Sequence, residues 1–204
     1  MIYIIADTHG DFSSFSKKQI KHLGEGDHLI IAGDFGFLWD NNEREHKLIK
    51  KIGMKKHTTI FIQGDNDRAE LYRELPEGEV CGGRMKNLFG NLWLACPGVF
   101  EIEGHKLLLC GQPDGSEEEQ FISALLSSEE IKNTSFDGIV TYEPPVSLGE
   151  FLMGEYDTGD QGYIFERAKQ ELDFKCWYFG KLHQNKIITS KYCAVFDEPQ
   201  LIDR

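Results

Sequence analysis

Five acidic or imidazole side chains follow directly after short apolar segments of this 204-residue sequence. They are Asp7, His9, Asp34, Asp65 and His183. If the segments are strands of an open α/β sheet, their ends share one edge, and ligands bind in the crevice outside that edge. Carboxylate oxygens and imidazole nitrogens together suit Mn²⁺, Fe or Zn²⁺. The residue types and their positions therefore predict a metal site.

Each of these residues also has an ordinary structural interpretation. An aspartate after a buried strand often caps the next helix, and taken singly this interpretation is the better one for Asp7 and Asp34. A lone histidine such as His9 or His183 is more often a plain polar residue than a ligand. The metal site is favoured because four such residues would otherwise have to fall at strand ends on one edge by accident.

The first third of the chain repeats an apolar strand, an acidic loop and a helix. Strands are predicted at residues 2–6, 28–32 and 58–63, and helices at 12–23 and 43–54. This alternation predicts parallel strands joined by crossover helices. No basic residue precedes segment 2–6, so we interpret it as a first strand and not as a signal peptide.

The remaining elements are less regular. Further strands are predicted at 91–96, 98–102, 106–111, 137–142 and 176–180, helices at 117–132 and 162–172, and a final hairpin at 186–196. Residues 111–119 and 153–162 are expected to be mobile surface loops. Without a repeat or a low-complexity linker, we expect residues 1–204 to form a single domain.

Composition restricts the classes of partner. No apolar run approaches the roughly 20 residues that span a bilayer, so we expect no membrane partner. The formal net charge of −12 disfavours binding to long nucleic acids, because no basic stripe is available. The five cysteines lack metal-ligand spacing and are expected to be buried free thiols, which favours a cytoplasmic location.

Five motifs in order give the sequence a resemblance to the calcineurin-like metallophosphoesterases over residues 3–184. They are Asp7-Thr8-His9, Gly33-Asp34, Gly64-Asp65-Asn66-Asp67, Val140-Thr141-Tyr142-Glu143-Pro144-Pro145 and Gly180-Lys181-Leu182-His183. The resemblance implies an α/β fold, a two-sheet β sandwich flanked by helices (α-β-β-α). It also implies phosphoester hydrolysis at two metal ions about 3.5–4 Å apart.

The first metal site of this family is matched completely. The resemblance implies that Asp7, His9, Asp34 and His183 bind one divalent metal, either Mn, Fe or Zn. The second site is not matched: apart from the bridging Asp34, its positions hold Asp65, Tyr142 and Lys181. A second metal is therefore not implied.

An ammonium has no lone pair for a metal while it is charged. We expect Lys181 to replace the second metal electrostatically, lying between Asp34 and Asp65 with Asp65 as its salt-bridge partner. Tyr142 either donates its hydroxyl to this cluster or to a phosphate, or is a core aromatic.

The family's leaving-group histidine is matched by Asn66. We expect Asp34, Asn66 and Lys181 to act in catalysis. Loss of a positioned acid or base costs about 10²–10⁴-fold in rate, so any hydrolysis is expected to be slow or specialised.

Other candidates have two interpretations each. Arg68 and Arg84 are candidate phosphate contacts, although a surface ion pair is the favoured interpretation. Phe35, Phe37 and Trp39 either stack on a substrate or pack beneath their loop.

Three functions follow in order of preference. The first is a one-metal site that binds a phosphorylated small molecule or nucleotide and hydrolyses it slowly. The second is an inactive protein that sequesters or senses such a ligand. The third is a scaffold for a protein partner. The sequence leaves homo-oligomer formation open.

Overall fold

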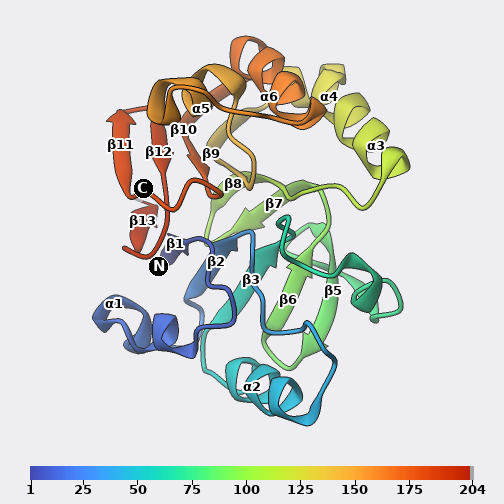
Figure 1. Ribbon diagram of the computed structural model, residues 1–204, viewed down its shortest axis with the longest axis vertical. Helices are drawn as coiled ribbons and strands as arrows, with labels where there is room; N and C mark the ends of the chain where they lie inside the picture. The colour runs from blue at the N-terminus through green and yellow to red at the C-terminus, as the bar shows by residue number, and fades with distance from the viewer. Residues whose placement is uncertain (203–204) are drawn as a thin grey trace.

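Two β-sheets pack face to face, with helices on the outer face of each, in the computed structural model, which describes residues 1–202 (Figure 1). The expected two-sheet α/β sandwich is thereby confirmed. Among residues 1–202, no helix is long and apolar enough to cross a membrane.

The first sheet has seven strands. Their order is β13 (Gln200–Ile202), β1 (Ile2–Ile5), β2 (His28–Ala32), β3 (Thr58–Ile62), β6 (Leu92–Ala95), β5 (Gly83–Phe89) and β4 (Glu77–Val80). Strands β1, β2, β3 and β6 are parallel to their neighbours in this run, whereas β13, β5 and β4 pair antiparallel at the margins. The parallel centre brings the ends of β1, β2 and β3 to one edge.

The second sheet has six strands. Their order is β11 (Lys186–Thr189), β12 (Tyr192–Ala194), β10 (Asp173–Phe179), β9 (Ser135–Thr141), β8 (His105–Cys110) and β7 (Gly98–Ile102). The four central strands are parallel, and antiparallel hairpins form both margins.

The helices form the two outer layers. Helices α1 (Lys18–Lys21) and α2 (Glu43–Gly53) lie beside the first sheet, at the bottom of Figure 1. Helices α3 (Ser116–Ser127), α4 (Glu129–Lys132), α5 (Val146–Met153) and α6 (Asp160–Glu171) lie beside the second sheet, at the top. Short 3₁₀ helices occur at Phe12–Ser16 and Ala69–Leu71.

Alternate residues of each strand face different apolar layers. In β2, Ile30 packs between the sheets, whereas Ile31 faces the helical layer with Phe61 and Ile52. On the second sheet, Leu109 faces the sandwich interior. Strands that are buried on both faces have continuous apolar sequences, so the central strands could be predicted from the sequence.

Two predicted helices are each interrupted. The helix predicted at 12–23 is a 3₁₀ turn followed by α1, with Lys17 in an extended conformation between them. The helix predicted at 117–132 ends at Ser127, and Ser128 caps α4 by accepting a hydrogen bond from the Ile131 amide. The spacing of apolar residues does not reveal such breaks, because the segments before and after each break still bury the same face.

Besides the 3₁₀ helix at Ala69–Leu71, four elements were not predicted. Strands β4 and β5 are largely polar and partly exposed, and β13 is a three-residue strand that pairs with β1, which is distant in the sequence. Helix α5 follows Pro145 without a side-chain cap. Parts of the two expected loops are also helical, because α3 begins at Ser116 and α6 at Asp160.

Candidate metal centre

Loops after β1, β2 and β10 carry the four predicted ligands of the first metal. Asp7 and His9 follow β1, Asp34 follows β2, and His183 follows β10 of the other sheet. The nearest candidate ligand atoms of the four residues all lie within 4.8 Å of one another. Two sheets therefore supply one cluster.

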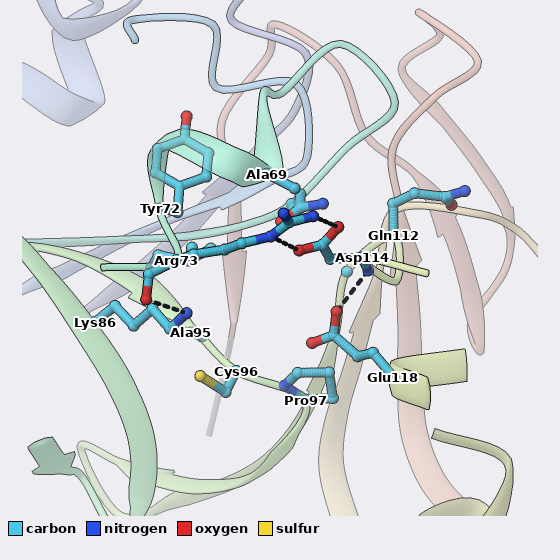
Figure 2. A pocket seen from close by; sticks show the side chains of 13 residues that line it. Ala69, Tyr72, Arg73, Lys86, Ala95, Cys96, Pro97, Gln112, Asp114 and Glu118 are labelled. Atoms are coloured by element: carbon cyan, nitrogen blue, oxygen red, sulfur yellow. Dashed lines mark hydrogen bonds and ion pairs between the residues drawn. The ribbon is translucent and has the colours of Figure 1, made fainter. Parts of the chain in front are cut away.

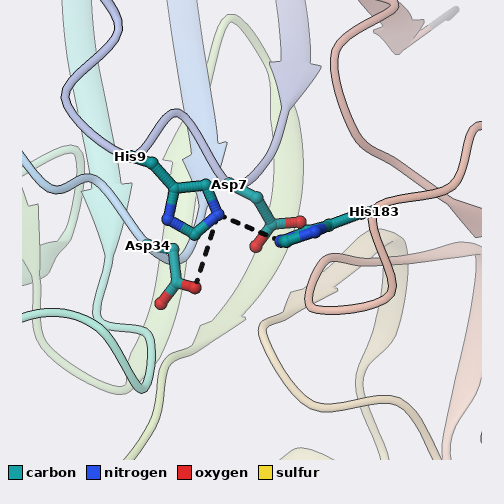
Figure 3. Close-up of side chains that lie close together, drawn as sticks. All are labelled: Asp7, His9, Asp34 and His183. Atoms are coloured by element: carbon teal, nitrogen blue, oxygen red, sulfur yellow. Dashed lines mark hydrogen bonds and ion pairs between the residues drawn. The ribbon is translucent and has the colours of Figure 1, made fainter.

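The two imidazoles face each other within this cluster. His9 Nε2 lies 3.0 Å from His183 Nε2 and 3.9 Å from Asp34 Oδ2 (Figure 3). Mixed nitrogen and oxygen donors of this kind suit Mn, Fe or Zn.

The backbone of these loops is strained. Asp7, His9, Asp34 and His183 have positive φ angles of 51°, 45°, 47° and 49°. Such conformations cost roughly 1–3 kcal/mol each in residues other than glycine, and they cluster at functional sites. Lys181 shares this conformation, with φ 66°. The fold therefore supports an unfavourable backbone at the residues that point into the cluster.

Asp34 is almost fully buried and is held by three hydrogen-bond donors. The Asn66 amide N and Nδ2 donate to its two oxygens at 2.8 Å each, and the Tyr142 hydroxyl donates to Oδ2 at 3.0 Å. Burial and the Asp34 carboxylate raise the pKa of Tyr142, so the hydroxyl stays protonated as a donor. Of the two interpretations of Tyr142, the structure shows a buried aromatic that also donates to the cluster.

Gly33 makes the Tyr142 contact sterically possible. A Cβ atom on Gly33 would lie 2.1 Å from the Tyr142 ring, and Gly33 has a φ of 89°. Only glycine meets both conditions at this position.

Asp67 positions the loops around Asp34. Its carboxylate accepts hydrogen bonds from the backbone amides of Phe35, Gly36 and Gly64. Burial raises the pKa of Asp67 to about 6 although these bonds oppose the shift. We did not assign Asp67 a role from the sequence, although it lies in the Gly64-Asp65-Asn66-Asp67 motif.

Asp7 provides the observation that a cation fits. It is buried, Oδ1 accepts from the Lys181 backbone amide at 3.2 Å, and Oδ2 has no hydrogen-bond partner within residues 1–202. Burial and the nearby Asp34 carboxylate raise the pKa of Asp7 to about 8 in the metal-free protein. A divalent ion would satisfy the unpaired oxygen and remove the repulsion.

The second half of the site holds an ammonium in place of metal ligands. Lys181 Nζ lies 2.8 Å from Asp65 Oδ2 and also donates to Glu143 Oε2. Burial alone lowers the pKa of Lys181, but the hydrogen bonds with Asp65 and Glu143 outweigh it and raise the pKa above its ordinary value. The lysine stays charged, so these residues do not fit a second metal.

The partners of Lys181 differ in part from the prediction. Asp65 is its salt-bridge partner as expected, but the second carboxylate is Glu143 and not Asp34. Glu143 is 2% exposed and also accepts from Tyr156 and Thr158 hydroxyls. The signal for Glu143 was its position just past strand β9, the same signal that identified the aspartates.

The remaining candidates lie outside the cluster. Arg68 pairs with Glu70 at 2.6 Å, and Arg84 pairs with Glu77 at 3.3 Å, as surface ion pairs do. Aromatic residues Phe35 and Phe37 are fully buried in the core, whereas Trp39 is 45% exposed. Of the three aromatics, only Trp39 is available for stacking.

Comparison with known proteins places this geometry in a family context. A model of the calcineurin-like phosphoesterases matches residues 1–185. No match is found among curated proteins. Among solved structures, a protein of unknown function from Aquifex aeolicus is similar at 14% identity and a TM-score of 0.40. That similarity covers 85% of this chain and 87% of the other.

Metal binding is predicted to depend on pH through Asp7. Because the metal-free pKa is raised to about 8, a proton competes with the ion below that pH. Mn²⁺ affinity, measured by calorimetric titration, should rise about fivefold between pH 7 and 8, about twofold more up to pH 9, and then level off. Asp7→Asn should bind weakly without this rise. An affinity in the wild type that is already constant above pH 7 would contradict a protonated Asp7.

Removing the ammonium is predicted to destabilise the fold. Lys181→Met leaves Glu143 buried without its cation, which should cost about 3–5 kcal/mol in urea unfolding. The control is Lys47→Met, because Lys47 forms an exposed pair with Glu43. That change should stay within about 0.5 kcal/mol. Equal losses in the two variants would show that the buried ion pair is not specifically required.

Proposed function

The chain belongs to the calcineurin-like phosphoesterase family, and we propose that it binds a phosphorylated small molecule or nucleotide at a one-metal site. We further propose that it hydrolyses the phosphoester bond slowly. One observation supports this function above the others: a complete cluster of four metal-ligand residues lies beside a charged lysine where a second metal would be held.

The proposed division of roles follows from these contacts. Asp7, His9, Asp34 and His183 would hold a divalent metal, which would supply Lewis acidity toward a phosphoryl oxygen. Asn66 and Tyr142 orient the Asp34 carboxylate and partly offset its charge by hydrogen bonding. Lys181 provides a fixed positive charge that attracts the phosphate and stabilises negative charge that develops on it.

Slow hydrolysis follows from what Asn66 cannot do. Its amide N–H is too weak an acid to protonate a leaving alkoxide, and both of its nitrogens already donate to Asp34. The missing acid accounts for a loss of about 10²–10⁴-fold in rate. A substrate whose alcohol leaves readily would be least affected.

The same observation favours a second candidate function, binding without hydrolysis. A metal and a lysine attract a phosphate, while the absence of a leaving-group acid slows its cleavage. A protein of this type would sequester or sense its ligand in the cleft.

Hydrolysis of phosphomonoester and phosphodiester reporters in excess Mn²⁺ distinguishes these functions. We expect slow turnover that falls by at least about 10²-fold in Asp34→Asn, because the central ligand is lost. The matched control is Asp173→Asn at an exposed position with no ion pair in the described chain, and it should retain full activity.

Two other outcomes change the assignment. Absence of turnover, together with stabilisation of the Mn²⁺-loaded protein by inorganic phosphate in thermal melts, would establish the binding protein instead. Turnover that persists in Asp34→Asn would contradict catalysis at this centre.

A further inference from the structure

A pocket adjoins the metal centre on the side of Lys181. Its volume is about 280 Å³. Six of its lining residues carry the argument: Gln112, Glu119, Glu143, Asp160, Gln161 and Lys181. It lies at the N-terminal ends of α3 and α6, two 12-residue helices that have no side-chain caps.

Lys181 connects this pocket to the metal centre. Its side chain lines the pocket, while its backbone amide donates to the metal-ligand residue Asp7. A group esterified to a phosphate at the metal centre therefore has this pocket as a neighbouring space.

Two buried amide oxygens at this pocket have no hydrogen-bond partner within residues 1–202: Gln112 Oε1 and Gln161 Oε1. Gln161 is 4% exposed, and its Nε2 donates to the Gly111 carbonyl at 2.7 Å, which leaves Oε1 as the unpaired atom. Gln112 also lines a neighbouring pocket, which Figure 2 shows. There its side chain extends away from the Arg73–Asp114 ion pair. Unpaired buried acceptors are costly, so both oxygens call for a donor.

Two carboxylates of the pocket also lack a hydrogen-bond donor. Glu119 and Asp160 make no side-chain hydrogen bond or ion pair within the described chain, and the Lys181 ammonium is already shared by Asp65 and Glu143. The pocket therefore has two more carboxylates than ammonium groups.

These acceptors are not arranged as a metal site. Among residues 1–202, the four residues of the metal centre form the one acidic or imidazole cluster close enough to share an ion. An ammonium group, in contrast, carries three N–H donors and a positive charge, and so can satisfy separate acceptors.

We propose that this pocket binds the protonated amine of the substrate's alcohol moiety, so that the phosphoester is that of an amino alcohol. This inference rests on the proposed function, because it assumes that the phosphate lies at the metal centre. An alcohol moiety with a further negative charge would be repelled by Glu119 and Asp160.

Calorimetric titration of the Mn²⁺-loaded protein with two probes of nearly equal shape tests the proposal. They are O-phosphoethanolamine, which ends in an ammonium group, and n-propyl phosphate, which ends in a methyl group at the same position. We expect about tenfold tighter binding of O-phosphoethanolamine, the effect of one charge-assisted hydrogen bond. The preference should disappear in the double variant Glu119→Gln with Asp160→Asn.

The matched control is Glu150→Gln with Asp173→Asn, which changes the net charge equally at exposed positions. This variant should keep the preference, and thermal melts should show that both variants fold. Equal wild-type affinities for the two probes would overturn the amine pocket while leaving the phosphate site intact. Failure of both probes to bind would overturn the phosphate site itself. A preference that persists in Glu119→Gln with Asp160→Asn would place the amine elsewhere and also overturn the proposal.

Discussion

The ion pairs of Lys181 determine the charge and the metal-binding capacity of the region beside the metal-ligand cluster. Its ammonium lies between Asp65, in the loop after β3 of the first sheet, and the buried Glu143, in the loop after β9 of the second, and so links the two halves of the sandwich beside the metal-ligand cluster. Glu143 would be a costly unpaired charge without this cation. The lysine also supplies positive charge without metal-binding capacity, and the rest of the centre is consistent with that replacement.

Asp34 is a buried carboxylate held by hydrogen-bond donors from two other loops. Asn66 Nδ2 and the Tyr142 hydroxyl donate to its Oδ2, and His9 Nε2 lies 3.9 Å from the same oxygen. These hydrogen bonds fix the orientation of the carboxylate within the cluster of candidate metal ligands. Asn66 supplies two of these hydrogen bonds, and its amide N–H is too weak an acid to protonate a leaving group.

Sequence reasoning succeeded where burial and chain direction determine position. Apolar segments buried on both faces identified the parallel strands, and Asp7, His9 and Asp34 lie together because β1 and β2 end at one edge of the first sheet. His183 joins them from β10 of the second sheet, which the edge of a single sheet does not explain. It failed for β13, whose pairing with β1 is long-range, and for the breaks at Lys17 and Ser128. The Lys181–Asp65 pair followed from charge alone, whereas Glu143 depends on how β9 and β10 align across the second sheet.

The central claim is that the centre holds one metal ion and one ammonium in place of two metal ions. Mn²⁺ content by mass spectrometry, together with electron paramagnetic resonance of protein equilibrated with excess Mn²⁺ and desalted, tests it directly. We predict one Mn²⁺ per chain and a spectrum without exchange coupling. Two ions per chain with an exchange-coupled spectrum would contradict the claim, since coupling requires a second metal at the position that Lys181 occupies.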